Sequence, residues 1–410
     1  MNSTFKNRII ILIFFFGLVS IYLPEITCNT NPSHSFITVE GKTSFPNNDL
    51  SWNLKSISVD GAWELTNGSK AVTIAIIDSG IDFSIPNLQG SNWINKNETA
   101  LNGIDDDNNG YIDDITGWDF VSVDNTPYEG DSHWHGSYVA NWAKEVAPNV
   151  SIMDLRILDS ENSFNGSFWK HIVAAVNYSI NMDADVINLS IWCYGVPPSS
   201  FHDILKRAIA EGIVIVGTTG NTWDDSSTKG VQYPGKFPEV IATSSISSNQ
   251  KISTFSRKGP ENEICAPGEN LAPLGSIRAN GTSFAAPHVC GCIALMKSIN
   301  KSLTPVDVRT ILASTANDKG LPGRDESYGY GLLNVTNAVR GAAGLQIWNY
   351  TMVPVSTTTD DITRTATTSK ENSSTMITTT TETSTSHQTN FLILEMICIV
   401  FVLLRKKKRT

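Results

Sequence analysis

Apolar residues gather in short segments of this chain, and segments with helical periodicity separate them. Residues 71–77 form an apolar run, and residues 151–158, 185–191 and 213–216 read as further strands. Runs of this length are typical of strands that are buried on both faces of a sheet. Helical patterns cover residues 52–67, 168–180 and 201–211. Because strands that alternate with helices are joined by right-handed crossovers, the pattern predicts an α/β fold with a mostly parallel sheet.

The N-terminal end of the chain has a different pattern from the middle. Two basic residues, Lys6 and Arg8, precede an apolar core within residues 1–28. This arrangement predicts a secretory signal peptide, and an uncleaved membrane anchor is the alternative. Residues 29–48 form a short polar segment, and residues 49–344 are long enough for one large domain.

The C-terminal end combines a polar stalk, an apolar segment and a basic cluster. Residues 345–390 are rich in Thr and Ser and cannot bury a core, so they predict an extended, O-glycosylated stalk. Residues 391–404 are apolar apart from Glu395 but number only fourteen, and a full membrane span needs about twenty. The basic residues in 405–410 fit a cytoplasmic stop signal. We therefore expect an ectodomain attached to the membrane at the cell surface, with a removable sorting signal as the alternative.

Composition limits the classes of partner and of metal site. The net charge of −10 over 410 residues makes nucleic acid an unexpected partner. Four of the six cysteines lie in the predicted domain, at Cys193, Cys265, Cys290 and Cys292. No CxxC pair or histidine cluster accompanies them, which argues against a zinc site. Their spacing leaves buried thiols and a single disulfide both open.

A tight turn with a glycine runs into an apolar helical stretch at residues 280–296. Ser283, just after Gly281, would have its hydroxyl exposed beside unpaired backbone N–H groups at the positive end of the helix dipole. These are the conditions for a serine nucleophile whose oxyanion needs hydrogen-bond donors. An N-capping serine is the alternative.

Three other polar residues follow or precede apolar runs. Asp78 comes directly after the run at 71–77, at the end of a predicted strand where open α/β sheets place their sites. His135 begins an apolar helical run, from which it can project into a cleft as a base. Asn221 follows the run at 213–216, and its amide can donate to a developing oxyanion. A turn residue at Asp78 or Asn221 and an isolated histidine are the alternatives.

The order Asp78, His135, Ser283 and the residues around them resemble the three motifs of the subtilisin-like serine proteases. The stretch Asn-Gly-Thr-Ser-Phe-Ala-Ala-Pro-His-Val at 280–289 matches almost letter for letter. Further matching blocks extend the resemblance over roughly residues 49–340. The resemblance implies a doubly wound, mostly parallel sheet with helices on both faces. It also implies a serine endopeptidase that acts on protein or peptide substrates as a monomeric catalytic domain.

The resemblance assigns a role to each candidate residue. Ser283 is the nucleophile, His135 the general base and Asp78 the acid that orients the imidazole. His135 is preferred over His133 because the Gly-Ser and Val-Ala pairs of the motif follow it. Asn221 and the Ser283 N–H are the oxyanion donors.

The resemblance also implies where substrate binds. The expected contact residues are Ser190, Trp192 and Gly220. Trp192 stands where the family usually has a small glycine, so it either narrows the primary specificity pocket or turns outward. Two departures lie on the helix after His135, because Tyr138 replaces a usual histidine and Asn141 a usual glycine. Residues 29–48 are too short for the usual pro-domain. A non-catalytic surface binding module on the same fold is therefore the alternative function.

An acidic segment at residues 102–114 predicts a site for Ca²⁺. Its alternating oxygen side chains and its Gly110 match the first half of an EF-hand-type loop. The closing glutamate is absent, because that position is Thr116, so one of the last two aspartates would close the site. Many subtilisin-like proteases have a similar insert, and a solvated acidic loop is the alternative. The candidate ligands are Asp105, Asp107, Asn109, the Tyr111 carbonyl, Asp113 and Asp114.

Overall fold

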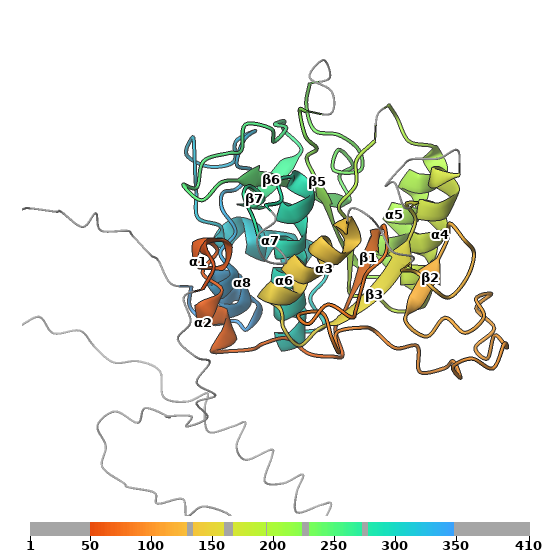
Figure 1. Ribbon diagram of the computed structural model, residues 1–410. Coiled ribbons are helices and arrows are strands. Elements are labelled where there is room, and N and C mark those ends of the chain that lie inside the picture. Colours follow the sequence, from red (N-terminus) through yellow and green to blue (C-terminus); the bar gives the residue numbers. More distant parts are fainter. Residues whose placement is uncertain are drawn as a thin grey trace, which may run out of the picture. The chain divides into compact units, whose positions relative to one another are not determined.

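The computed structural model describes residues 50–128, 134–159, 167–193, 195–223, 229–272 and 278–347. They contain a seven-stranded sheet in which every neighbouring pair of strands is parallel, in the order β2-β3-β1-β4-β5-β6-β7 (Figure 1). The strands are β1 Thr73–Asp78, β2 Gly117–Asp119, β3 Ser151–Arg156, β4 Val186–Leu189, β5 Val214–Thr218, β6 Val240–Ile246 and β7 Asn262–Pro267. The four strand segments predicted from the sequence correspond to β1, β3, β4 and β5.

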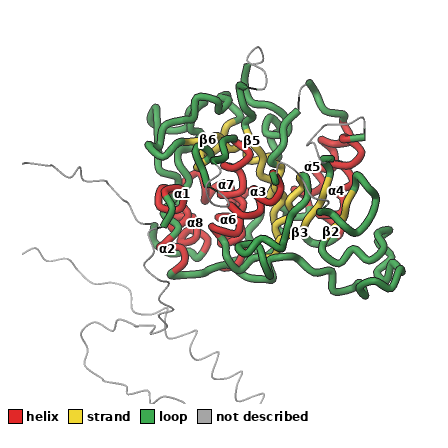
Figure 2. Tube along the Cα trace, viewed as in Figure 1, coloured by secondary structure: helices red, strands yellow, loops and turns green. Residues whose placement is uncertain are grey.

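Helices cover both faces of the sheet, as expected of a doubly wound fold (Figure 2). On one face, α4 Phe168–Asn181 and α5 Ser199–Ala210 pack on one apolar cluster. On the other face, a second cluster joins the sheet to the remaining helices. These are α1 Trp52–Ser56, α2 Asp60–Trp63, α3 His135–Val146, α6 Thr282–Ile299, α7 Pro305–Thr315 and α8 Val335–Ala342.

The alternation of side chains along β1 explains why both faces are covered. All six residues of β1 are buried. Ile74 and Ile76 belong to the cluster under α3 and α6, whereas Ala75 and Ile77 belong to the cluster under α4 and α5. Because successive strand side chains point to opposite faces, one apolar run supplies both cores.

The strand order reverses direction at β1. The chain adds β3 on one side of β1 and then β4 on the other side. In a parallel sheet the crevice beyond the carboxyl ends of the strands, at such a reversal, is where side chains from several loops converge. Asp78 is the last residue of β1 and therefore lies at this position.

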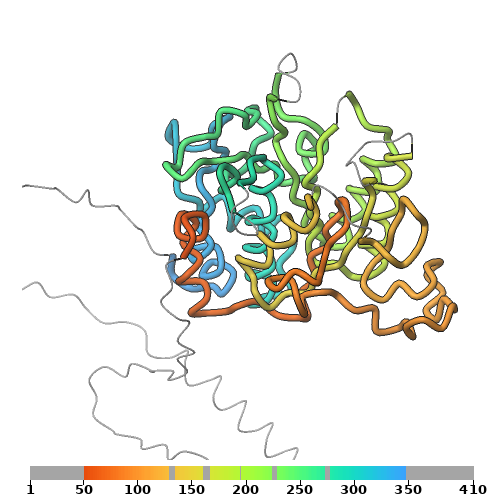
Figure 3. Tube along the Cα trace, in the orientation of Figure 1, coloured from red at the N-terminus to blue at the C-terminus, as the bar shows by residue number. Residues whose placement is uncertain are grey.

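The helical pattern predicted over residues 52–67 is present only in part, because the segment forms two short helices, α1 and α2, with non-helical residues between and after them. Ser58, between them, has a φ of 53° and so leaves the helical region. Its carbonyl accepts hydrogen bonds from the backbone and the side chain of Thr336, at the start of α8. Figure 3 shows these early and late segments side by side. The break in the helix is therefore set by a distant part of the chain.

Several sequence predictions concern residues that the structure does not describe. The signal peptide, most of the stalk, the C-terminal apolar segment and His133 all fall in this category. Within the described ranges, no helix has the length and apolar character that a membrane span requires. The four cysteines of the domain are free thiols, and three of them are buried.

Candidate active site

Asp78 and His135 lie in direct contact at the carboxyl end of β1. His135 Nδ1 is 2.7 Å from Asp78 Oδ1. Asp78 is only 1% exposed, whereas the His135 side chain is 23% exposed. Because an ionised carboxylate only accepts hydrogen bonds, Nδ1 of His135 carries the proton and donates it to Asp78. Nε2 is then the unprotonated nitrogen of the ring, which is the tautomer that a general base requires.

The first turn of α3 is pressed against the turn that follows Asp78. Ser79 Oγ accepts a hydrogen bond from the Gly136 N–H at 3.1 Å. A Cβ atom on Gly136 would lie 2.4 Å from the Gly80 carbonyl oxygen, so only glycine allows this approach. The glycine after His135 in the motif thus has a physical reason, since it brings the imidazole to the end of β1.

Ser283 is the second residue of α6 and is 6% exposed. Pro287, four residues later, has no N–H, so the Ser283 carbonyl lacks its usual helical donor. Ser190 Oγ donates to that carbonyl at 2.7 Å and accepts from Asn188 Nδ2 at 2.9 Å. The first turn of α6 is therefore fixed to the segment after β4, where the sequence placed a substrate contact.

The side chain of His135 also contacts the start of α6. The rings of His135 and Phe284 have centroids 5.5 Å apart. Phe284 directly follows Ser283, so the aspartate–histidine pair lies against the residue next to the predicted nucleophile.

Asn221 is oriented by the first residue of α6. Its Oδ1 accepts hydrogen bonds from both the backbone N–H and the hydroxyl of Thr282, each at 3.0 Å. The Thr282 N–H is one of the helix-terminal donors that have no partner within the helix. Because the amide oxygen is occupied, Nδ2 is the end of Asn221 that is left to donate. Gly220 before it has a φ of 89°, and a Cβ there would lie 2.2 Å from Gln232 Oε1.

The predicted substrate edge follows β4. Ser190 is buried and Trp192 is half-buried. The N–H of Cys193 donates to the Tyr233 carbonyl at 2.9 Å, which ties this edge to the segment after β5. The effect of Trp192 on the specificity pocket stays a prediction.

This geometry can be compared with known proteins. A model of the subtilase family matches residues 69–331. Subtilisin E of Bacillus subtilis (strain 168) is 33% identical over 284 residues, which cover 66% of this chain and 66% of that protein. The subtilisin of Bacillus pumilus is 33% identical over 284 residues, which cover 66% of this chain and 91% of that protein. The crystal structure of a lanthipeptide protease has a TM-score of 0.56 at 24% identity, covering 70% of this chain and 95% of that one.

The family model matches well over half of the chain. The chain belongs to the subtilase family. Subtilases are serine-type endopeptidases, and the family resemblance and the fold class inferred from the sequence are confirmed. The likeness to the lanthipeptide protease, at its low identity, supports the fold alone. The chain spans about two thirds of the length of Subtilisin E.

One departure of this subtilase from its family pattern is explained by a polar network behind the site. Asn141 Nδ2 donates to Glu145 Oε1 at 3.1 Å, and Asn141 Oδ1 accepts from Asn87 Nδ2 at 2.6 Å. Burial raises the pKa of Glu145 to about 7, although hydrogen bonds from Asn141 and Asn53 act to lower this pKa. The asparagine at a usual glycine position therefore has two partners within α3 and the loop after β1.

A second polar contact joins the same region to α6. His288 is fully buried, and its Nδ1 lies 2.8 Å from the Phe284 carbonyl, so Nδ1 is the donor. Nε2 therefore accepts from Asn53 Nδ2 at 3.1 Å. Burial lowers the pKa of His288 to about 4. This histidine is neutral at neutral pH and holds the N-terminal helix α1 against the helix that carries Ser283.

A long loop, drawn in green in Figure 2, joins β1 to β2 and contains the acidic segment of this subtilase. Oxygen atoms of Glu98, Asp105 and Asp107 lie within 4.8 Å of one another. Carboxylate oxygens are the ligands that Ca²⁺ prefers, so the donor set fits this ion. Two of the three were predicted from the sequence. Glu98 was missed because it precedes the EF-hand-like spacing, and its only sequence signal is an acidic residue seven positions before Asp105.

The remaining predicted side-chain ligands accept hydrogen bonds, as Asp105, Asp107 and Glu98 also do. Asn109 Oδ1 accepts from the Tyr111 N–H. Asp113 accepts from the backbone N–H groups of Asn102 and Gly103. Asp114 accepts from the Tyr178 hydroxyl, and burial raises its pKa. Glu98 is the third carboxylate of the cluster, and Asn109, the Tyr111 carbonyl, Asp113 and Asp114 stay predicted ligands.

Proposed function

We propose that Asp78, His135 and Ser283 act as a catalytic triad in peptide-bond hydrolysis through an acyl-enzyme. The 2.7 Å contact that fixes the His135 tautomer, beside the first turn of α6, carries this proposal. The family membership supports the same chemistry. The sequence order of the three residues is that of subtilisin.

In the proposed mechanism, Ser283 Oγ attacks the peptide carbonyl carbon while His135 Nε2 takes its proton. Nδ2 of Asn221 and the Ser283 N–H donate to the resulting oxyanion. His135 then gives the proton to the leaving amine as the C–N bond breaks. Asp78 stabilises the imidazolium without taking the proton. Water, activated by the same histidine, hydrolyses the acyl-enzyme and restores Ser283.

The test compares hydrolysis of a peptide and of a matching ester by the full-length protein. We expect turnover of both substrates, and Ser283→Ala removes nearly all of it. Ser298→Ala is the matched control, because Ser298 lies at the far end of α6 and its hydroxyl bonds to Leu295. Ester turnover without peptide turnover would place the chain among esterases. Peptide turnover that survives Ser283→Ala would contradict the triad.

We also propose a structural calcium ion, which Glu98, Asp105 and Asp107 would hold. Three carboxylates in one loop repel each other, and a divalent cation would neutralise much of that charge when bound. The ion would stabilise the loop between β1 and β2 and takes no part in the proposed catalysis.

We further propose that the enzyme is secreted and attached to the cell surface by its C-terminal end. The predicted signal at 1–28, the stalk at 345–390 and the apolar and basic segments at 391–410 support this proposal. One related protein is named an extracellular protease, from Bacillus subtilis (strain 168). Cell fractionation tests it, with full-length protein expected in the membrane fraction and a chain ending at residue 390 in the medium. Release of both forms into the medium would contradict the attachment.

A further inference from the structure

A buried acidic residue that the proposed mechanism does not use lies next to the catalytic strand. Asp154, in the middle of β3, is 1% exposed. The register of the two strands pairs it with Ile76, two residues before Asp78. A carboxyl group in a fully buried strand is costly unless it has a partner. The partner of Asp154 therefore indicates why an acid occupies this position.

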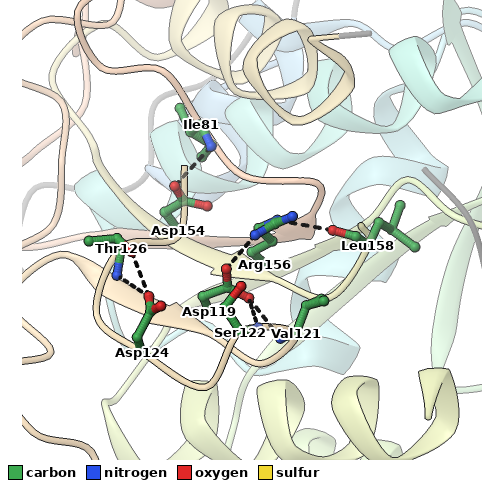
Figure 4. A network of polar contacts seen from close by, with 9 residues as sticks. All are labelled: Ile81, Asp119, Val121, Ser122, Asp124, Thr126, Asp154, Arg156 and Leu158. Atoms are coloured by element: carbon green, nitrogen blue, oxygen red, sulfur yellow. Dashed lines mark hydrogen bonds and ion pairs between the residues drawn. The ribbon is translucent and has the colours of Figure 1, made fainter. Parts of the chain in front are cut away.

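Asp154 contacts the turn that follows the catalytic aspartate. Its Oδ2 accepts a hydrogen bond from the Ile81 N–H at 2.8 Å (Figure 4). Ile81 lies three residues after Asp78, on the turn whose Ser79 and Gly80 meet the start of α3. Asp154 thus holds this turn from the sheet side.

The opposite side of the same turn is held by α3. Ser79 Oγ accepts from Gly136, and the N–H of Asp82 donates to Ser137 Oγ at 2.9 Å. The turn is therefore fixed between β3 and the helix that begins with His135. Loss of either set of contacts would let the end of β1 move relative to the imidazole.

We propose that Asp154 is a positioning residue for the catalytic Asp78. By accepting from Ile81, its carboxyl group fixes the turn that sets Asp78 against His135. The inference rests on the proposed triad, and Asp154 itself touches neither the substrate nor the reacting atoms.

The charges around Asp154 indicate which form of its carboxyl group does this. It faces Asp78 on β1, Asp119 on β2 and Arg156 on its own strand. Arg156 Nη1 is already held by Asp119 Oδ2 at 2.5 Å, and its Nε donates to the Leu158 carbonyl (Figure 4). Burial and the charges of Asp119 and Asp78 raise the pKa of Asp154 well above its usual range. The hydrogen bond from the Ile81 N–H and the charge of Arg156 lower this pKa but do not outweigh the burial.

Hydrogen bonding supports the neutral form as well. Among the described residues, Asp78 Oδ2 and Asp154 Oδ1 are both buried without a hydrogen-bond partner. Two ionised carboxylates with uncompensated oxygens would repel each other strongly in such an environment. A proton on Asp154 removes one of these charges and leaves Oδ2 free to accept from Ile81. The neutral acid therefore holds the turn without opposing the negative charge of Asp78.

The test measures kcat, KM and the rate of inactivation by a fluorophosphonate for variants of the full-length protein. Asp154→Ala removes the acceptor, and we expect kcat and the inactivation rate to fall roughly tenfold or more with KM nearly unchanged. Asp154→Asn keeps an acceptor oxygen and the neutral shape, so it should stay within about threefold of the wild type. In the pH profile of kcat/KM, the acidic limb of Asp154→Asn should lie at the same pH as that of the wild type. If Asp154 is neutral, the substitution removes no charge near His135.

Met153→Ala is the matched control, because Met153 is the neighbour of Asp154 on β3 but faces the α4 and α5 cluster. It should lower the melting temperature and spare kcat. Wild-type kcat in Asp154→Ala, or a loss in Asp154→Asn equal to that in the alanine variant, would overturn the proposal. An acidic limb shifted to lower pH in Asp154→Asn would overturn the neutral form.

Misfolding of a variant and failure of the proposed triad can both be distinguished from failure of the role proposed for Asp154. If Asp154→Ala does not fold, the asparagine variant still decides, since more than a tenfold loss in it contradicts the proposal. If the wild type itself is not labelled, the proposed triad fails rather than the role of Asp154.

Discussion

The side chain of Asn221 takes its orientation from the residue beside the nucleophile. Both donors of Thr282 occupy its amide oxygen, so the amino group is the end of the side chain that is left to donate. The same contacts satisfy a helix-terminal N–H that would otherwise be buried without a partner. One residue therefore completes the N-terminus of α6 and, in the proposed mechanism, supplies a donor for the oxyanion.

Replacing Asn221 by Ala should lower kcat by about 10²–10³ with little change in KM, because the lost donor acts on charge that develops in the transition state. Steady-state kinetics on a peptide substrate measure both constants. The melting temperature serves as the control, since the Thr282 contacts are lost as well. A loss below tenfold in a folded variant would contradict the oxyanion role.

The position of Trp192 in the predicted substrate edge leads to a second prediction, which concerns the size of the primary specificity pocket. If its half-buried ring narrows the primary pocket, Trp192→Gly should raise kcat/KM for substrates with a large residue before the cleaved bond. The ratio of kcat/KM for phenylalanine and alanine substrates should rise by about tenfold or more, since each added methylene in a pocket changes binding by about 1–3 kcal/mol. An unchanged ratio would show that the tryptophan turns outward.

Residues within short motifs were predictable from the sequence, and residues that act across strands were not. Asp78, His135, Ser283 and Asn221 stand in local patterns that specify a strand end or a helix start. Asp154 appeared only as an acid in an apolar strand. Its contact with Ile81 depends on the register of β3 with β1, which no local pattern contains.

At the scale of elements, α3 and α6 carry the proposed base and nucleophile, and Asn53 of α1 contacts Glu145 of α3 and His288 of α6. Glu145, near the end of α3, is the member of this network whose pKa is raised. The unfolded chain releases its proton near the ordinary pKa of 4.5, whereas the folded chain holds it up to a pH of about 7. The proton therefore stabilises the fold below pH 4.5, and this contribution is lost as pH rises through 7.

Glu145→Gln tests this linkage, because glutamine keeps an oxygen for Asn141 but cannot ionise. The melting temperature of the variant relative to the wild type should rise by several degrees between pH 4.5 and 7.5. Differential scanning fluorimetry across this pH range measures it. A difference that is constant with pH would contradict the raised pKa.

The strands that the sequence revealed lie in segments that are mostly apolar. Strand β6 was not predicted, although all seven of its residues are buried. Its polar residues include Ser244 and Ser245, which bond to Ser327 and Ser253 from other segments. A strand whose polar side chains are satisfied by distant partners has no apolar run, so its burial cannot be read locally.

At the scale of the whole domain, the reversal of strand order at β1 gathers residues that are far apart in the sequence. The same strand begins the long loop with the three carboxylates, so the proposed calcium site and the proposed triad share one element. A cation bound there stabilises the folded chain by mass action, by about 2.7 kcal/mol at a hundredfold excess over Kd.

Calcium should therefore raise the melting temperature relative to a chelator, and the double variant Asp105→Ala, Asp107→Ala should abolish that rise. Asp106→Ala is the matched control, because Asp106 lies between them but accepts from Thr99 and Asn102 instead. Thermal unfolding with and without calcium measures the effect. An equal calcium response in the double variant and the wild type would contradict the site.

The most direct test of the central claim is covalent labelling of the full-length protein by a fluorophosphonate, followed by mass spectrometry of the modified peptide. The proposed triad predicts a single adduct on Ser283, and its loss in Ser283→Ala and in His135→Ala. An absence of label in folded, calcium-loaded protein, or an adduct on another serine, would contradict an activated Ser283 and favour a non-catalytic binding module on the subtilase fold.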